Sequence, residues 1–262
     1  MTRRLLVVIA ACLIVGGCAT QSPTDPGIKP TTPTTGDETP QRSRARIHTE
    51  LAAGYYQLGN MNVAVEEVMI ATQSDPTYAP AYTVAGLIYA SLNQDQQAEQ
   101  NFRHALSIDP TNPNANHNFG QFLCQRKRGK EGIQYFMAAV RNPLYRTPES
   151  SYVNAGACAR QMGDMVAAEN YFRQALRIRP NQPQALFNLS EMAYERKDYD
   201  VAKKEMDSLM RVIKPNAEAL WLALRIERGL GDSASAASYA QQLRKNFPNS
   251  KEAGALRAGQ FE

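Results

Sequence analysis

Residues 81–110, AYTVAGLIYASLNQDQQAEQNFRHALSIDP, contain the positions that decide the fold, because each of them returns along the chain. The slot held by Asn93 recurs at 59, 93, 127, 163, 197 and 231, in steps of 34, 34, 36, 34 and 34 residues. Ala98 recurs as a small residue, and Phe102 recurs four positions later as a large one. A fixed period of this length is typical of stacked helical hairpins, each of which buries its apolar face against its neighbours. The chain is therefore predicted to be a helical array with a binding function.

Six copies of this pattern cover residues 45–250. The small slot holds Ala64, Ala98, Gly132, Ala168, Ala202 and Ala236, and the large slot holds Val68, Phe102, Phe136, Phe172, Met206 and Ala240. A proline ends the second helix of four copies, since its ring clashes with the preceding turn. The pattern resembles the tetratricopeptide repeat. The resemblance implies an all-α chain, a right-handed α-solenoid superhelix of six hairpins at 45–78, 79–112, 113–148, 149–182, 183–216 and 217–250, with a capping tail at 251–262.

The N-terminus has the features of an export signal. Two arginines precede an apolar run from Leu5 to Val15, which is too short for a membrane-spanning helix of ~20 residues. We therefore interpret residues 1–17 as a signal peptide. Residues 13–18 resemble a bacterial lipobox, which implies that Cys18 is lipidated and, with Ala19 next to it, that the protein is anchored in the outer membrane facing the periplasm. The alternative is a secreted protein with a stray cysteine.

Residues 18–44 are predicted to be a disordered tether, because they are rich in proline and threonine and contain almost nothing apolar. The net charge of the whole chain is +4, and it falls to +2 without the two arginines of residues 1–17. This charge is too small to indicate a nucleic-acid partner. The basic run at 126–128 falls at a turn between two helices, where we expect it to be solvated.

Two cysteines, Cys124 and Cys158, remain for the folded part of the chain. Both fall in the first helices of consecutive hairpins, which pack side by side. Such positions can bring the Cα atoms within the ~4.4–6.8 Å that a disulfide needs, and an oxidising compartment favours the bond. The alternative is two buried thiols. A bond here would join the third hairpin to the fourth across the 36-residue step, where a longer loop is expected at 142–149.

No sequence feature indicates catalysis. The three histidines lie in different repeats, and no cluster has metal-ligand spacing. We expect no enzyme activity, metal, cofactor or small-molecule substrate. The first helices instead are expected to line a groove for a protein partner. The predicted groove residues are Tyr56, Leu87, His117, Gln121, Val153, Arg160, Phe187, Tyr194, Trp221, Arg225 and Arg228. Trp221 is the sharpest candidate anchor, although it could equally pack in the core between repeats.

Three segments carry a more specific resemblance: NHNFGQFLC at 116–124, NPLY at 142–145 and NAGAC at 154–158. With the lipobox, the tether and the six repeats, they resemble the PilF/PilW family of type IV pilus biogenesis lipoproteins. The family pattern has tyrosine in place of Phe119 and usually an aromatic residue in place of Gln121. The resemblance implies a non-catalytic pilotin-like factor that binds the secretin, or another pilus assembly protein, and supports its localisation, multimerisation or stability.

The rival interpretation is a tetratricopeptide lipoprotein that serves as a scaffold for another envelope machine, in barrel assembly or in peptidoglycan synthesis and hydrolysis. An envelope hydrolase on a helical scaffold is a third alternative, which a buried polar cluster in the structure would favour.

Overall fold

The computed structural model describes residues 38–261, so the predictions for residues 1–37, which include the signal peptide, Cys18 and most of the tether, lie outside the described residues. The described residues form helices and no strands. The helices are α1 (Pro40–Gln57), α2 (Met61–Ser74), α3 (Ala79–Ser91), α4 (Asp95–Ile108), α5 (Pro113–Gln125), α6 (Gly129–Arg141), α7 (Pro148–Gln161), α8 (Met165–Ile178), α9 (Pro183–Glu195), α10 (Tyr199–Met210), α11 (Ala217–Leu230), α12 (Ser233–Asn246) and α13 (Lys251–Ala258).

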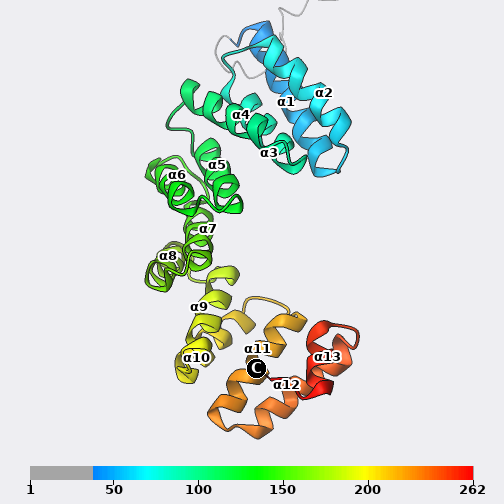
Figure 1. The fold of residues 1–262 in the computed structure, drawn as a ribbon, viewed down its shortest axis with the longest axis vertical. Coiled ribbons are helices and arrows are strands. Elements are labelled where there is room, and N and C mark those ends of the chain that lie inside the picture. Colours follow the sequence, from blue (N-terminus) through cyan, green and yellow to red (C-terminus); the bar gives the residue numbers. More distant parts are fainter. Residues whose placement is uncertain (1–37, 262) are drawn as a thin grey trace, which may run out of the picture. The chain divides into compact units, whose positions relative to one another are not determined.

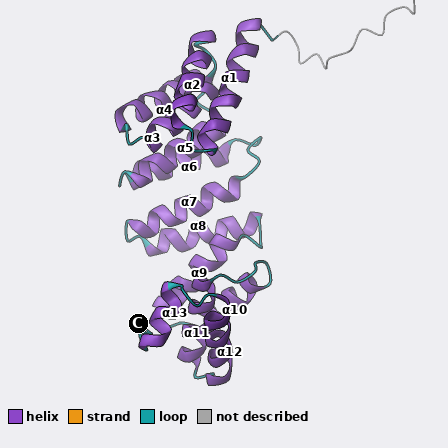
Figure 2. Cartoon of the chain, turned by 90° about the vertical axis from the view of Figure 1, so that its right-hand side faces the viewer, coloured by secondary structure: helices purple, strands orange, loops and turns teal. Residues whose placement is uncertain are grey.

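Consecutive helices pair into six hairpins, from α1–α2 to α11–α12, which follow one another in chain order (Figure 1). Each hairpin also packs on the next, and first helices of neighbouring hairpins touch in the pairs α1–α3, α3–α5, α5–α7 and α9–α11. Figure 2 shows the same pairs from a second direction. The predicted all-α array of helix hairpins is therefore confirmed. None of the helices among residues 38–261 has the length and apolar content needed to cross a bilayer.

A left-handed backbone conformation explains the slot that recurs at 59, 93, 127, 163, 197 and 231. All six residues have positive φ, between 57° for Asn93 and 82° for Gly163, and each follows the end of a first helix. A residue in this left-handed region lets the last carbonyls of a helix find N–H donors while the chain reverses. After α1, for example, the Gly59 N–H donates to the Tyr56 carbonyl at 3.0 Å. Glycine adopts this conformation without steric cost, which explains its frequency in the slot.

The small and large slots form the contact between the two helices of a hairpin. Phe102, Phe136 and Phe172 are fully buried, and a Cβ atom added to Gly86 would lie 2.7 Å from the Phe102 ring. The third hairpin is tighter still, because a Cβ atom on Gly132 would lie 2.6 Å from the Gly120 carbonyl oxygen. Backbone meets backbone at this crossing, so a glycine replaces the alanine of the other copies.

One predicted boundary shifts in the structure, at the N-terminal end of the array. The prediction that residues 40–44 belong to the tether is wrong, because α1 begins at Pro40. The Thr39 side chain accepts a hydrogen bond from the Arg42 N–H at 3.2 Å, and the Arg42 guanidinium lies 2.6 Å from the Asp75 carboxylate at the end of α2. These contacts tie the first turn to the first hairpin. At the other end, residues of the predicted capping tail form α13, which packs on α11 and α12 and buries Ala253.

Candidate functional site

Three predicted groove residues from the first three hairpins meet at one cavity. Tyr56 of α1, Leu87 of α3 and Gln121 of α5 line a cavity of about 230 Å³, which we call the N-terminal cavity. The Tyr56 hydroxyl lies 3.0 Å from the Ser91 hydroxyl, and Gln121 is exposed. The structure therefore brings these side chains together as predicted from the spacing of the repeats, in a site with a polar rim.

His117 belongs to a polar junction between the third and fourth hairpins. Its Nδ1 lies 2.7 Å from the Ser151 Oγ and 3.0 Å from the Tyr145 hydroxyl, and its Nε2 lies 3.3 Å from the Asn154 amide nitrogen. Tyr145 comes from the segment between α6 and α7, where the period gains two residues. Burial lowers the pKa of His117, so the neutral ring is favoured. We therefore correct its assignment from groove residue to junction residue.

This junction is also the buried polar cluster that would favour a hydrolase. A serine hydrogen-bonded to a histidine is the arrangement of a nucleophile and its base. The Ser151 side chain, however, is fully buried, and it also donates to the Tyr145 hydroxyl at 3.1 Å. A substrate has no access to this hydroxyl. Among the described residues, no three His, Cys, Asp or Glu side chains gather as metal ligands.

Val153 was predicted to line the groove, and this prediction is wrong. Its side chain is only 8% exposed and lies in a core cluster with Phe172 of α8 and Leu189 of α9. The matching positions Thr49 and Thr83 are buried as well. In these hairpins the side chain at this repeat position is buried between helices. The repeat period alone does not reveal which copies are buried.

Arg160 links α7 to α9 across the middle of the array. Its guanidinium lies 2.5 Å from the carboxylates of both Glu191 and Glu195, and it donates to the Asn188 side-chain oxygen at 3.3 Å. One cation thus faces two anions. The charge of Arg160 is already compensated within the chain, so this arginine is a bridge between hairpins rather than a free contact for an acidic partner.

Three of the predicted groove residues in α9 and α11 line a second cavity, which we call the C-terminal cavity. Phe187 of α9, Trp221 and Arg225 of α11, and residues of α13 line about 330 Å³. Arg225 also contacts Tyr194, with its guanidinium carbon 4.4 Å from the ring centre and its Nε donating to the hydroxyl at 3.2 Å. Trp221 is partly buried and packs on the core cluster of Leu220, Leu243 and Ala253 while also lining the cavity. Both interpretations of Trp221 are therefore partly correct.

Phe261 is the residue of this site that the sequence analysis missed. Its ring stacks on Trp221 with ring centres 5.7 Å apart, and the Arg228 guanidinium carbon lies 3.7 Å from its ring centre. Its carbonyl oxygen accepts a hydrogen bond from the Arg225 Nε at 3.0 Å. The only signal in the sequence is an aromatic residue shortly after Gly259, in a segment that we treated as a cap.

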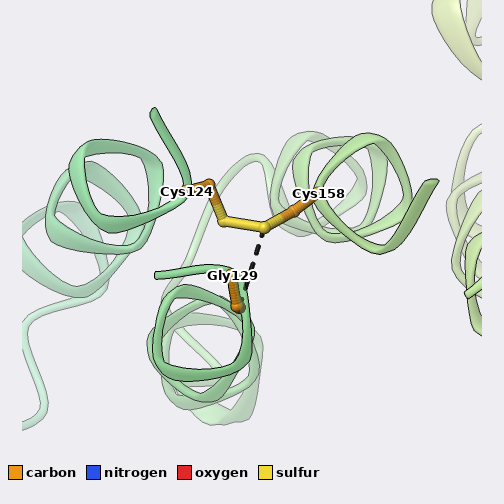
Figure 3. Close-up of a disulfide and its surroundings, with 3 residues drawn as sticks. All are labelled: Cys124, Gly129 and Cys158. Atoms are coloured by element: carbon orange, nitrogen blue, oxygen red, sulfur yellow. Dashed lines mark hydrogen bonds between the residues drawn. A yellow bond between two sulfur atoms is a disulfide. The ribbon is translucent and has the colours of Figure 1, made fainter. Parts of the chain in front are cut away.

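A disulfide joins Cys124 of α5 to Cys158 of α7 (Figure 3). The two Cα atoms are 5.8 Å apart, which lies within the range expected from the sequence. The Cys158 Sγ lies 3.7 Å from the Gly129 carbonyl oxygen at the start of α6. The bond therefore connects the first helices of the third and fourth hairpins, beside the junction that contains His117.

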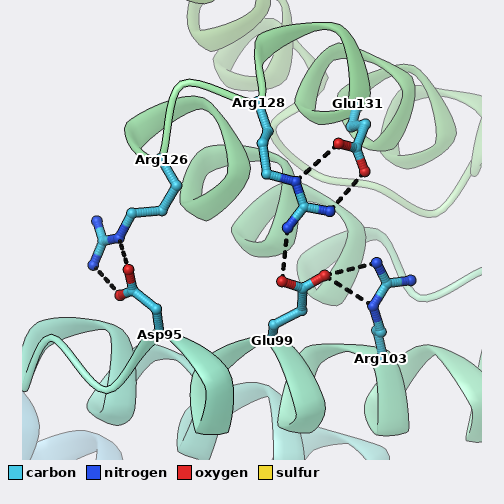
Figure 4. A network of polar contacts seen from close by, with 6 residues as sticks. All are labelled: Asp95, Glu99, Arg103, Arg126, Arg128 and Glu131. Carbon is cyan, nitrogen blue, oxygen red and sulfur yellow. Dashed lines mark hydrogen bonds and ion pairs between the residues drawn. The ribbon is translucent and has the colours of Figure 1, made fainter.

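The basic run at 126–128 is largely neutralised by α4 and α6 (Figure 4). Arg126 lies 2.7 Å from Asp95, and Arg128 lies 2.7 Å from both Glu99 and Glu131. A hydrogen bond from Arg128 is the main cause that holds the pKa of Glu99 below its usual value. These pairs join the second hairpin to the third. The predicted turn lies between α5 and α6 with Lys127 exposed, and its two arginines also form contacts between hairpins.

Comparison with known proteins agrees with this architecture. Tetratricopeptide repeat families match residues 79–112, 159–225 and 219–250. The chain is 30% identical over 225 residues to the type IV pilus assembly protein PilF of Pseudomonas aeruginosa, which covers 84% of this chain and 89% of PilF.

Two solved structures share both fold and sequence with the chain. The crystal structure of PilW, described as a widely conserved type IV pilus biogenesis factor, superposes with a TM-score of 0.72 at 32% identity, over 81% of this chain and 97% of PilW. The structure of PilF from Pseudomonas aeruginosa gives a TM-score of 0.75 at 28% identity, over 84% of this chain and the whole of PilF.

Proposed function

Because the chain belongs to the PilF/PilW family of type IV pilus biogenesis proteins, we propose that it is a non-catalytic outer-membrane lipoprotein that binds the secretin, or another pilus assembly protein, through its first helices. In this role it would support the localisation, multimerisation or stability of its partner. Family membership, which places the chain among proteins of type IV pilus biogenesis, is the observation that carries the proposal.

The C-terminal cavity is the part of the groove that best suits a protein partner. It offers the apolar surfaces of Phe187 and Trp221 next to the guanidinium of Arg225. Tryptophan and arginine are the residue types that contribute most to binding energy in protein interfaces. By contrast, Val153 is buried in the core, His117 is hydrogen-bonded within the polar junction, and Arg160 is paired with carboxylates. We therefore place the main partner contact at α9, α11 and α13.

The anchoring part of the proposal rests on Cys18 and the segment before it, which lie outside the described residues. Several acyl chains on one cysteine would exceed the two signals needed for stable membrane attachment. A Cys18→Ser variant should then be lost from the outer-membrane fraction. If this variant stays in the outer membrane, lipidation of Cys18 is not what holds the protein there.

The function is tested in a strain that lacks the gene. We expect fewer heat-resistant secretin multimers on a gel, fewer pili and reduced twitching, with recovery when the wild-type gene is restored. Restoration with a Trp221→Ala variant should give less recovery than a variant of an exposed residue far from the site, such as Leu144→Ala. Normal multimers, pili and twitching in the deletion strain would reject the proposal and favour a scaffold of another envelope machine.

A further inference from the structure

The segment after α13 is inserted into the candidate partner site. Gly259 ends α13 with a φ of 68°, and the Gln260 N–H donates to the Ala255 carbonyl at 3.0 Å. This arrangement is typical of a helix end with a left-handed glycine. This turn directs Phe261 back onto α11. The chain thus places one of its own aromatic side chains on Trp221, which is the main candidate for contact with a partner.

Three different interactions hold Phe261, and each could equally bind an aromatic side chain or the backbone of another peptide. Trp221 stacks on the ring, Arg228 lies over the ring at 3.7 Å, and Arg225 binds the main-chain carbonyl at 3.0 Å. Stacking and cation–π contacts recognise an aromatic side chain, and the hydrogen bond recognises a backbone. Together they form a site for an aromatic residue within a peptide segment.

The two arginines of this site differ from Arg160, the third arginine of the predicted groove. Arg160 is paired with two carboxylates, whereas within residues 38–261 neither Arg225 nor Arg228 forms an ion pair. Their guanidinium groups are used on aromatic rings and on a carbonyl oxygen. The Arg225 Nε–H is shared between the Phe261 carbonyl and the Tyr194 hydroxyl, and the Tyr194 ring also packs against the guanidinium, so Tyr194 of α9 helps to position this donor.

Two cavities reach the residues of this site. The C-terminal cavity of about 330 Å³ reaches Trp221, and a further cavity of about 390 Å³ is lined by Phe261 with Leu224, Arg228 and Leu256. A longer peptide could therefore continue past the aromatic residue into the cavity that Phe261 lines. Phe261 itself remains partly exposed, as expected for an occupant that can leave without opening the core.

We propose that Trp221, Arg225 and Arg228 form a binding site for an aromatic residue of the partner protein, and that Phe261 is an internal competitor for this site. The identity of the partner as a pilus protein rests on the proposed function, but the site itself does not. Partner binding then requires release of Phe261. An internal occupant that fills the site for nine-tenths of the time weakens the apparent affinity for a competing segment about tenfold.

The sole tryptophan of the chain reports directly on this site. In purified full-length protein, Phe261→Ala should shift the emission of Trp221 to longer wavelength and increase its quenching by acrylamide. The matched control is Gln260→Ala, which changes the neighbouring exposed residue and should leave the emission unchanged. Identical emission and quenching in the wild type and in Phe261→Ala would overturn the proposal, because Phe261 would then not cover Trp221.

Binding is measured with a synthetic peptide that copies residues 258–261, acetyl-Ala-Gly-Gln-Phe-amide, and with a control peptide that ends in alanine. We expect the phenylalanine peptide to bind Phe261→Ala about tenfold more tightly than it binds the wild type, and the alanine peptide to bind neither. Adding Arg228→Gln to Phe261→Ala should lower the affinity for the phenylalanine peptide. Equal affinity of both peptides, or equal affinity for both proteins, would overturn the inference.

A second arm separates this inference from the proposed function. A periplasmic fragment of the secretin is tested against the wild type and against Phe261→Ala, with the phenylalanine peptide as competitor. If the fragment binds neither protein while the peptide results hold, the secretin is the wrong partner and the aromatic site stands. If the fragment binds both proteins equally and the peptide does not compete, the proposed function stands and the aromatic site is rejected.

Discussion

Removing the disulfide is the sharpest test of how the array is held together. Cys124 and Cys158 are 34 residues apart in sequence, and their bond closes a loop that contains all of α6. If the bond acts by restricting the unfolded chain, a loop of this length reduces the entropy of that chain by about 13 cal/mol/K, or about 3.8 kcal/mol at 25 °C. This is a large share of the ~5–15 kcal/mol by which domains are stable.

The assay is urea unfolding followed by circular dichroism at 222 nm. We expect reduction of the wild type to lower the free energy of unfolding by roughly 2–4 kcal/mol and to steepen its dependence on urea, because the unfolded chain without the bond exposes more surface. A Cys124→Ala/Cys158→Ala variant should behave like the reduced wild type and should not respond to the reducing agent. This variant controls for effects of the reagent elsewhere.

A loss below about 1 kcal/mol in the reduced wild type would refute the reasoning, because the bond would then not restrict the unfolded chain by the expected amount. A large loss in the double alanine variant but not in the reduced wild type would assign the stability to packing of the sulfur atoms. Cys158 is 2% exposed, so such packing is the relevant alternative.

Three further predictions concern single side chains. Gly132→Ala should lower the free energy of unfolding by about 1–3 kcal/mol, because its Cβ would lie 2.5 Å from the Cys124 Sγ. Gly54→Ala, whose Cβ would have no atom within 4 Å, should raise it by roughly 0.5–1 kcal/mol because alanine has the better helix propensity. Urea titration measures both variants, and stabilisation by both would contradict the close packing at Gly132. Lys197→Gly should raise the free energy of unfolding by about 0.5–1 kcal/mol in the same titration, because Lys197 has a φ of 63°, which glycine adopts without steric cost. No gain would show that contacts of the lysine side chain offset this backbone strain. His117→Gln should flatten the pH dependence of the free energy of unfolding between about pH 7.5 and 5.5. Folding lowers the pKa of His117, so the neutral ring contributes its full stabilisation above the unfolded pKa of ~6.5. This stabilisation is lost as the pH falls through the lower pKa of the folded state. Equal slopes in wild type and variant would contradict that assignment.

The repeat could be predicted from the sequence because its signals are local. A residue such as Gly163 fixes the backbone at the end of a helix, and small residues such as Ala168 allow two helices to approach. Each signal needs only its own hairpin to be meaningful. The pairing of Cys124 with Cys158 could be proposed from the same register, because the repeat determines which helices lie side by side, but the register did not exclude two buried thiols.

The groove could be predicted only in part, because it depends on what each slot meets in the neighbouring hairpins. Val153 and Phe187 occupy the same slot, but Val153 is buried while Phe187 lines the C-terminal cavity. Nothing periodic indicates that Phe261 returns to Trp221, since that contact depends on a turn at Gly259 after the last repeat. The start of α1 was missed although Thr39 and Pro40 form a helix start, because the composition before them is typical of a tether.

The disulfide also determines how a pulling force would travel through the chain. A load applied between the N-terminal part and a partner held at α11 must pass from α5 to α7. Because Cys124 and Cys158 are joined covalently, that load crosses directly between them. Residues 125–157, with α6 and the irregular segment that carries Tyr145, are bypassed and bear no tension. The tension is then carried by the hairpins on either side of the bond.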